Sequence, residues 1–346
     1  MQGEGVGVGV QEPLALFRNL LTLPLCILVT LSACTATTPS PQGGGNHPAG
    51  AEETYLVSPE NLKPLSLGEG EILLVATSTT IIQDVVANVG GEAVAATSLI
   101  PAGIDPHAFE PTPQDLKAVT EADGVFVHGM GLEASMAKLF EGAGDSKTIA
   151  VSSGITPIPL RTPSAHEGEG RIDPHTWMDP ANVMVWTENI EKSLSALDPA
   201  HADLYRTNAD RYQEELRGLH QYIESAVAQI PATQRKLVTD HEELGYFAAR
   251  YGFEIVGTIV PGASTLAEPS AQGLAGLDDA IRRSGVRAIF TSSVVSPVLT
   301  QRVAQDTGAI VVTLYAHSLS SPEGPAATYL DLMRYNVDAI VDGLVP

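Results

Sequence analysis

The sequence predicts an α/β fold of two lobes, each with a roughly four-stranded parallel sheet flanked by helices, joined by one long helix. Short apolar segments alternate with amphipathic ones along most of the chain, which is typical of parallel sheets covered on both faces. This alternation occurs twice, and a long amphipathic segment separates the two series. The chain has 346 residues, of which 44% are hydrophobic. That content is sufficient for two cores of medium size.

The expected elements of the first half are four short apolar strands with helical patterns between them. The strands lie at 72–77, 93–99, 124–128 and 148–152, and helices at 80–89 and 114–122. The second half repeats the arrangement. Its strands lie at 237–239, 254–259, 288–291 and 310–314, and its helices at 271–284, 298–307 and 327–344.

The segment 198–230 predicts the connecting helix. Asp198 is a suitable N-cap residue, and Pro199 is tolerated at the first helical position. Apolar residues then recur on one face as far as Ile230. At 1.5 Å per residue this helix is about 45–50 Å long, enough to reach along both lobes. A single stiff connector predicts limited rigid-body movement between them.

The N-terminus is typical of a bacterial lipoprotein. Residues 20–31 (LLTLPLCILVTL) form an apolar segment that is too short to span a bilayer but suits a signal-peptide core. It ends in Leu31-Ser32-Ala33-Cys34, which resembles a lipobox. The resemblance implies a signal peptide at 1–33 and a lipid on Cys34, with a structural cysteine in a short buried helix as the alternative. Both cysteines, Cys26 and Cys34, lie in this region, so the rest of the chain has no disulfide or thiolate metal site.

The composition also divides the chain into parts. Residues 34–70 are rich in Pro, Ser, Gly and Thr, and we expect a flexible spacer there. We expect an N-terminal lobe at 71–197, the connecting helix at 198–230 and a C-terminal lobe at 231–346. The formal net charge of −22 argues against a nucleic-acid partner. Phosphate-loop, dinucleotide-binding and serine-hydrolase motifs are absent from the sequence.

The tripeptide Asp-Pro-His occurs twice, at 105–107 and 173–175. Proline fixes its own φ and restrains the residue before it, so each tripeptide is a stiff mount for an imidazole. Asp105 and Asp173 are expected to accept hydrogen bonds that orient the rings or cap the following turn. Asp179-Pro180 is instead interpreted as the start of the next helix.

Four histidines follow predicted strands, where ligands bind in open parallel sheets. His107 and His175 follow the second and fourth strands of the first lobe, and His241 and His317 follow the first and fourth strands of the second. A lone loop histidine is usually solvated or capping. Four at equivalent positions predict a shared metal site in the cleft between the lobes.

At these residues the chain resembles the zinc/manganese class (cluster A-I) of periplasmic-type metal solute-binding lipoproteins of ABC importers. The matching segments are DPHAFEPTPQD (105–115), DPHTWMDP (173–180), GYFAARYG (245–252), EPSAQGLAGL (268–277) and YLDLMRYNVDAI (329–340). The resemblance covers residues 70–346 and implies one metal ion between two lobes, delivered to a membrane permease driven by an ATPase. It implies an extracytoplasmic, lipid-anchored protein without enzymatic activity, and we expect a monomer. The family's four ligands fall on His107, His175, His241 and position 317.

Two positions depart from the family pattern. The family generally has a carboxylate where this chain has His317, so either His317 ligates or the fourth ligand is Glu242, Glu243 or water. We favour His317 and place Glu242 beside the ligands. The family's Asn-Gly is replaced by His128-Gly129, and His128 is interpreted as a packing or supporting residue. Glu133 matches the pattern without an assigned role.

The expected ligands, which are imidazole nitrogens, predict that the bound metal is zinc rather than manganese. Imidazole suits Zn²⁺, whereas Mn²⁺ prefers carboxylate and water oxygens, and the family's manganese members carry a carboxylate at the position of His241. His166, in the short acidic segment HEGEG, is at best an auxiliary capture residue. The alternatives are a manganese- or iron-binding member of the family, a surface-anchored metallohydrolase with Glu242 or Glu243 as general base, and an adhesin.

Overall fold

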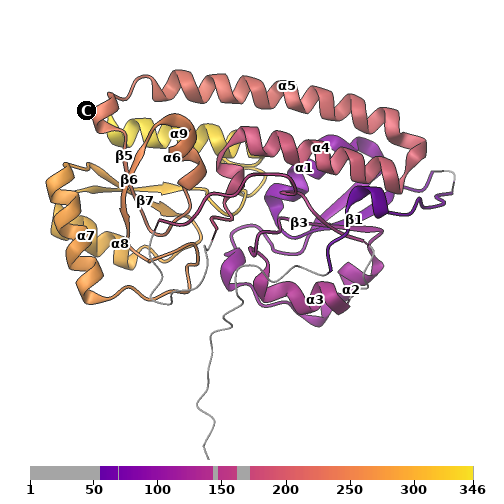
Figure 1. Ribbon diagram of the computed structural model, residues 1–346, viewed down its shortest axis with the longest axis horizontal. Helices are drawn as coiled ribbons and strands as arrows, with labels where there is room; N and C mark the ends of the chain where they lie inside the picture. The colour runs from indigo at the N-terminus through magenta and orange to yellow at the C-terminus, as the bar shows by residue number, and fades with distance from the viewer. Residues whose placement is uncertain (1–54, 69, 143–146, 162–171, 346) are drawn as a thin grey trace, which may run out of the picture. The chain divides into compact units, whose positions relative to one another are not determined.

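Two four-stranded parallel sheets form the framework of the protein. The computed structural model describes residues 55–68, 70–142, 147–161 and 172–345 (Figure 1). The strand order is β2-β1-β3-β4 in the N-terminal lobe and β6-β5-β7-β8 in the C-terminal lobe, so the two sheets have the same topology. The strands are β1 Leu73–Thr77, β2 Val94–Ser98, β3 Gly124–Val127, β4 Thr148–Ala150, β5 Lys236–Thr239, β6 Glu254–Thr258, β7 Ala288–Ser292 and β8 Ile310–Leu314. The predicted fold class is confirmed, and the predicted strands agree with these bounds to within one or two residues.

The pairing is parallel throughout, which places all carboxyl ends of a sheet at one edge. Strands β1 and β2 pair residue for residue, from Leu73 with Val94 to Thr77 with Ser98. The register between β5 and β6 shifts between Leu237 and Val238. The loops that follow the strands therefore gather at one side of each sheet, which is where ligands bind in this architecture.

Helices cover both faces of the sheets, and side-chain caps fix where several of them begin. The α-helices are α1 Thr80–Gly90, α2 Pro113–Glu121, α3 Ala137–Gly142, α4 Pro180–Leu197, α5 Ala202–Val227, α6 Gly245–Tyr251, α7 Ala271–Ser284, α8 Val298–Thr307 and α9 Tyr329–Leu344. Thr112 and Asp115 form a capping box at α2, and Asp179 caps α4 with Pro180 at its first position. The prediction for Asp179-Pro180 is confirmed.

Helix α5 is shared by the two lobes. It packs against α1 and α4 of the N-terminal lobe and against α9 of the C-terminal lobe, as Figure 1 shows. Its apolar face, including Tyr205, Tyr212 and Leu219, belongs to one continuous core that includes residues of both sheets. The predicted connecting helix is confirmed, but its first turn is a 3-10 helix, Pro199–His201, before α5. The Asp198 carboxylate accepts hydrogen bonds at this turn, from the Tyr205 hydroxyl among others (2.8 Å).

The faces turned away from α5 have separate, smaller cores. Helices α2 and α3 cover the N-terminal sheet through Val119 and Phe140, and α7 and α8 cover the C-terminal sheet through Ile281 and Val303. Each lobe therefore has an outer core of its own, whereas the inner core is common to both. This arrangement leaves the loops at the carboxyl ends of the two sheets as the elements that meet between the lobes.

The folded body begins earlier than the sequence indicated. A spacer was expected as far as residue 70, yet Tyr55 is buried and its ring lies 5.5 Å from that of Phe140. The Val57 N–H also donates to the Thr148 carbonyl (2.8 Å), and Leu62 belongs to the inner core. The polar composition of the preceding residues concealed this short apolar segment, TyrLeuVal at 55–57.

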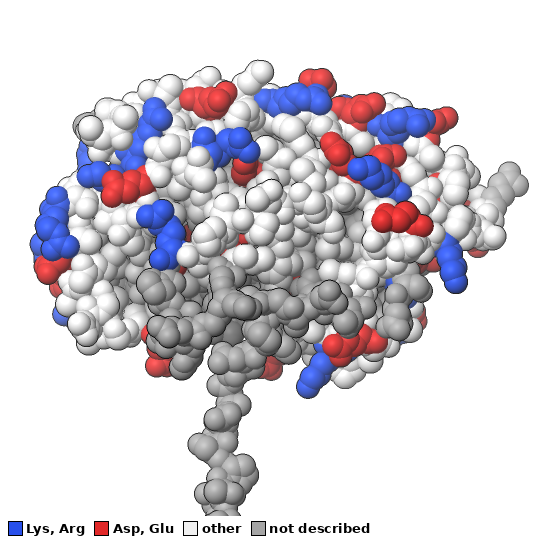
Figure 2. All heavy atoms as spheres, in the orientation of Figure 1, with Lys and Arg blue, Asp and Glu red and all other residues white. Residues whose placement is uncertain are grey.

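Some predictions concern residues outside those that the structure describes. The signal peptide, Cys34 and His166 all lie there. Among the described residues, no helix has the length and apolar character needed to cross a membrane. Acidic and basic side chains are interspersed over the face shown in Figure 2, which fits a solvated surface rather than a polyanion-binding one.

Candidate metal centre

Four imidazole rings meet at the carboxyl ends of the two sheets. His107 follows β2 in a 3-10 turn (Pro106–Ala108), and His175 follows β4 directly before a second such turn (Thr176–Met178). His241 follows β5, and His317 follows β8. The structure thus brings together all four predicted histidines, two from each lobe, within one cluster.

The Nε2 atoms of the four rings face one another. The Nε2–Nε2 distance is 3.2 Å between His107 and His175, 3.1 Å between His241 and His317, and 3.4 Å between His175 and His317. His175, His241 and His317 are buried, whereas His107 is partly exposed. The His107 ring centroid still lies 5.3–5.8 Å from those of the other three. Because it alone of the four is partly exposed, His107 is the ring of the cluster nearest to solvent.

Three of the rings are held through their Nδ1 atoms. His175 Nδ1 lies 2.8 Å from an Asp173 carboxylate oxygen, and His241 Nδ1 lies 2.6 Å from an Asp240 carboxylate oxygen. Because a carboxylate only accepts, Nδ1 carries the proton in both rings and Nε2 keeps its lone pair. His317 Nδ1 lies 3.0 Å from the Ser292 hydroxyl oxygen, which can accept in the same way. The free lone pairs of these rings therefore lie on the side where the cluster closes.

The two Asp-Pro-His segments differ in how the aspartate acts. Asp173 accepts both the backbone N–H of His175 (2.8 Å) and its ring Nδ1–H, so it caps the turn and orients the ring. Asp105 accepts the backbone N–H of His107 (2.9 Å) and thereby caps the turn. It also accepts the Thr265 hydroxyl from the C-terminal lobe.

The electrostatic environment favours neutral rings. Burial lowers the pKa of His175 and His317 well below the ordinary value, and repulsion from neighbouring histidines acts in the same direction. Burial in the cluster also lowers the pKa of His107, with contributions from His175 and His241. Metal binding requires unprotonated imidazole nitrogen. The lowered pKa values of His107, His175 and His317 therefore favour the unprotonated rings that a cation needs at neutral pH.

Glu242 and Glu243 follow His241, and their carboxyl groups have different neighbours. The Glu242 carboxylate accepts the backbone N–H of Arg161 (2.6 Å) from the N-terminal lobe. Glu243 is completely buried, and one of its carboxyl oxygens lies 3.8 Å from Nδ1 of both His241 and His317. It therefore lies on the Nδ1 side of these rings, opposite the Nε2 atoms. Burial raises the pKa of Glu243 well above its ordinary value, and the nearby carboxylates add to the shift, which favours its uncharged form.

Asp240 and Ser292 support the site, and the sequence analysis did not single them out. Besides holding His241, Asp240 accepts the backbone N–H of Ser292 (2.6 Å) and the Thr291 hydroxyl (3.1 Å). It thereby joins the ends of β5 and β7. The available signal was position, because both residues lie at the carboxyl end of a strand, as the four histidines do.

His128 and Glu133 organise the loop after β3. His128 Nδ1 lies 2.7 Å from the Gly129 carbonyl, so Nδ1 carries the proton and Nε2 accepts from the Thr176 hydroxyl (2.9 Å). Thr176 directly follows His175, so His128 supports that turn. Glu133 accepts the Ser78 hydroxyl and the His128 N–H, each at 2.6 Å. This carboxylate joins the ends of β1 and β3, a role that the sequence did not reveal.

The cluster is further held by contacts between the lobes. Trp177 donates from its indole nitrogen to the Ala316 carbonyl (2.6 Å), which directly precedes His317. The Tyr329 hydroxyl of α9 donates to the Trp177 carbonyl (2.7 Å). At Gly245, which begins α6, an added Cβ would lie 2.2 Å from an Asp173 carboxylate oxygen. Only glycine permits this close approach of the two lobes.

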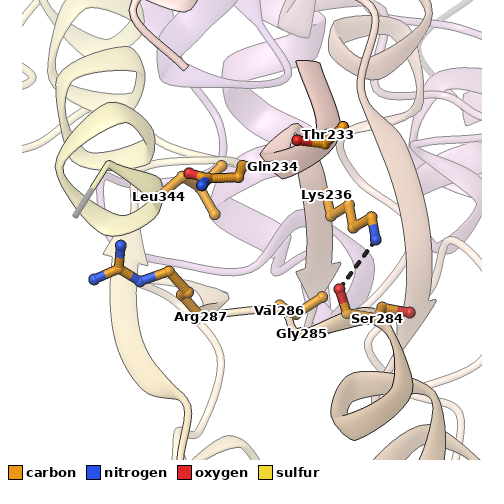
Figure 3. A pocket seen from close by; sticks show the side chains of 8 residues that line it. All are labelled: Thr233, Gln234, Lys236, Ser284, Gly285, Val286, Arg287 and Leu344. Carbon is orange, nitrogen blue, oxygen red and sulfur yellow. Dashed lines mark hydrogen bonds between the residues drawn. The ribbon is translucent and has the colours of Figure 1, made fainter. Parts of the chain in front are cut away.

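A second hollow lies at the opposite end of the C-terminal sheet, where β5 and β7 begin (Figure 3). Lys236 at the start of β5 donates from Nζ to the Ser284 carbonyl (3.0 Å). The residues that line it are Thr233, Gln234, Lys236, Ser284, Gly285, Val286, Arg287 and Leu344. None of these is a histidine, cysteine or carboxylate, in contrast to the four imidazoles of the cluster.

Comparison with known proteins places the chain in one family. Residues 75–343 match the family described as zinc-uptake complex component A, periplasmic (ZnuA). The chain belongs to the ZnuA family. The match includes both lobes, α5 and all four histidines of the cluster.

Relatives in the family differ in the metal that they bind. The chain is 36% identical to the iron-binding protein YfeA of Yersinia pestis over 78% of this chain and 85% of that protein. It is 34% identical to the manganese-binding lipoprotein MntA of Halalkalibacterium halodurans, over 80% of this chain and 90% of that one. The periplasmic zinc-binding protein TroA of Treponema pallidum has a similar structure, with a TM-score of 0.72 and 28% identity over 80% of this chain and all of that one. ZnuA-family proteins are solute-binding components of metal ABC importers and not enzymes, so the predicted class is confirmed and the metallohydrolase and adhesin alternatives are not favoured.

Proposed function

We propose that this solute-binding protein captures one Zn²⁺ between its lobes and holds it through the Nε2 atoms of His107, His175, His241 and His317. The ion is the cargo, and the permease and ATPase of the importer are the partners to which it is delivered. The two histidines of each lobe supply half of the ligands. Capture is thereby tied to the approach of the lobes.

The spacing of the Nε2 atoms is the observation that carries the proposal. A tetrahedral zinc site with Zn–N bonds of about 2.0–2.1 Å has edges of about 3.3–3.4 Å between its nitrogens. Three of the six Nε2–Nε2 distances are 3.1, 3.2 and 3.4 Å, and one ring nitrogen of each of the four histidines lies within 4.8 Å of those of the others. Lone pairs at this spacing repel one another, and a cation at the centre converts the repulsion into attraction.

The donor type supports zinc over the metals of several relatives. Manganese and iron are the ions named for MntA and YfeA. Mn²⁺ favours carboxylate and water oxygens, whereas imidazole suits Zn²⁺. The four side chains of the cluster offer nitrogen alone, and Glu243 lies on the Nδ1 side of its neighbours. His317 is the decisive member, because the family resemblance implies a carboxylate at that position.

A competitive titration tests this proposal. Purified metal-free protein is titrated with Zn²⁺, Mn²⁺ and Fe²⁺ by calorimetry, and metal content is measured by elemental analysis. The proposal expects one Zn²⁺ per chain and an affinity for Zn²⁺ at least about tenfold above that for the other two, equivalent to about 1.4 kcal/mol. Equal or stronger binding of Mn²⁺ or Fe²⁺ would overturn the assignment of zinc while leaving the family membership intact.

We also propose that the protein acts as a monomer tethered outside the cytoplasm by a lipid on Cys34. The lipobox-like sequence before Cys34 supports the lipid anchor, as does the description of MntA as a lipoprotein. Mass spectrometry of the membrane-extracted protein should find an acylated Cys34 at its N-terminus. Cys34→Ala should move the protein from the membrane to the soluble fraction. An unmodified Cys34 in membrane-extracted protein would exclude the anchor.

A further inference from the structure

The turn that carries His107 is bound directly to the opposite lobe. One Asp105 carboxylate oxygen accepts the His107 backbone N–H (2.9 Å), and the other accepts the Thr265 hydroxyl. Thr265 belongs to the loop between β6 and α7 of the C-terminal lobe. The carboxylate therefore joins the backbone of one cluster histidine to a side chain across the cleft.

The two loops occupy equivalent places in the lobes. Strand β2 is the edge strand next to β1, and β6 is the edge strand next to β5. His107 lies in the loop after β2, and Thr265 lies in the loop after β6. Because the sheets have the same topology, this contact joins the corresponding edge loops of the two lobes. It is a direct contact between the lobes.

A second cross-lobe contact acts on the same segment. The backbone N–H of Gly103 donates to the Ser318 hydroxyl oxygen (2.8 Å), and Ser318 directly follows His317. Gly103 has a φ of +80°, a conformation that glycine adopts without strain. Residues 103–107 are therefore bound to the C-terminal lobe at two points, through Gly103 and through Asp105.

His107 depends on these contacts more than the other three histidines do. His175, His241 and His317 are each held through ring Nδ1 by a neighbour in their own lobe, and all three are buried. His107 is partly exposed, and the contact that fixes it is made by its backbone N–H to Asp105. Loss of the Thr265 contact frees Asp105 and with it the His107 turn.

We infer that Thr265 is a positioning residue that latches the His107 turn across the cleft and thereby slows release of the bound metal. The inference deepens the proposed function, since it assigns control of release to a residue outside the four ligands. His107 is the first ligand to detach when the lobes separate. Association is affected less, because the Thr265–Asp105 contact opposes separation of the lobes rather than entry of the ion.

Thr265→Val removes the hydroxyl and keeps the shape of the side chain. Zinc release is measured by stopped-flow mixing of the zinc-loaded protein with excess chelator, and association by mixing metal-free protein with Zn²⁺. We expect release to be about tenfold faster, the size typical of one hydrogen bond to a charged group, and association to change less than about threefold. Thr265→Ser, which retains the hydroxyl, should restore slow release. An unchanged release rate in Thr265→Val, or a loss of slow release in Thr265→Ser as well, would overturn the latch.

Ser264→Ala is the matched control in the same loop. The Ser264 hydroxyl oxygen accepts the Leu266 N–H (3.3 Å), a contact within its own loop. This variant should release zinc at the wild-type rate. A release as fast as that of Thr265→Val would mean that loop stability, rather than the contact with Asp105, sets the rate, and this too would overturn the latch.

Hydrogen exchange separates failure of the latch from failure of the proposed function. In metal-free protein, the His107 amide hydrogen, which is bonded to Asp105, should exchange faster in Thr265→Val than in wild type. This readout needs no metal. If wild type binds no Zn²⁺, the proposed function fails while the exchange measurement still tests the latch. Equal exchange rates at His107 in the two proteins would contradict it.

Discussion

His175 and His317 come from opposite lobes, and their Nε2 atoms lie 3.4 Å apart. Each ring is also oriented within its own lobe, His175 by Asp173 and His317 by Ser292. Trp177 connects the two segments again, because it follows His175 closely and donates to the carbonyl of Ala316. The rings from the two lobes are therefore oriented within their own lobes, and they contact each other directly across the cleft.

Replacement of a central ring should abolish tight zinc binding. His175 lies within 3.4 Å of both His107 and His317 through Nε2, so His175→Ala removes a nitrogen that faces two others. We expect zinc affinity to fall by more than about 100-fold, beyond the 10–100-fold loss typical when only an outer hydrogen-bond partner is removed. Calorimetric titration measures the change. His220→Ala on α5, where His220 contacts Tyr251, is the control and should retain wild-type affinity. Wild-type affinity in His175→Ala would exclude it as a ligand.

Asp240 should matter through the orientation of His241. Its carboxylate lies 2.6 Å from His241 Nδ1 and fixes the ring with Nε2 unprotonated. Asp240→Asn keeps the size of the side chain but supplies a weaker, uncharged acceptor. We expect zinc affinity to fall by about 10–100-fold. Circular dichroism should show an intact fold, since the change is isosteric. An affinity within twofold of wild type would show that this contact does not support the ligand.

The identity of residue 317 should set the metal preference. His317→Asp introduces a carboxylate oxygen as a metal ligand. The Ser292 hydroxyl, which lies beside this position, can donate a hydrogen bond to the carboxylate. Because Mn²⁺ prefers oxygen ligands, the ratio of Mn²⁺ to Zn²⁺ affinity should rise by at least about tenfold. His317→Asn, which lacks the negative charge, should weaken both metals. Competitive titration measures the ratio of the two affinities. An unchanged ratio in His317→Asp would show that residue 317 does not set the metal preference.

The buried ring of His128 should make the metal-free protein sensitive to acid. Burial lowers the pKa of His128 from 6.5 to about 4. Below pH 6.5 the unfolded chain therefore binds a proton that the folded state does not. The free energy of unfolding should fall as pH decreases from 6.5 to about 4, by about 1.4 kcal/mol per unit from this group.

Chemical denaturation at several pH values measures this contribution by comparison with His128→Asn. Other buried groups titrate in both proteins, so the difference between the two curves isolates His128. The variant should lose less stability than wild type between pH 6.5 and pH 4.5. Parallel curves would show that His128 does not titrate as its burial indicates.

The sequence predicted the elements and the four histidines because both are signalled locally. Apolar alternation indicated the strands, and the position of His107 or His241 after a strand indicated the edge where loops converge. The residues that hold the rings were less predictable. Position at the end of a strand was a signal for Asp240 and Ser292. The contacts of Ser292 with His317 and of Thr265 with Asp105, however, join residues far apart in the sequence, and no local pattern encodes such proximity. The contacts of residues 55–57 with the folded body were missed for a similar reason, because Leu56 and Val57 pair with Thr148 of β4, which is distant in the sequence.

X-ray absorption at the zinc edge tests the central claim most directly. Wild-type protein loaded with one equivalent of Zn²⁺ should show four nitrogen neighbours at about 2.0–2.1 Å, with the outer-shell scattering of imidazole rings. His317→Ala should lose one of these neighbours. A spectrum of the wild-type protein with mainly oxygen neighbours, or with fewer than three imidazoles, would contradict ligation by the four rings.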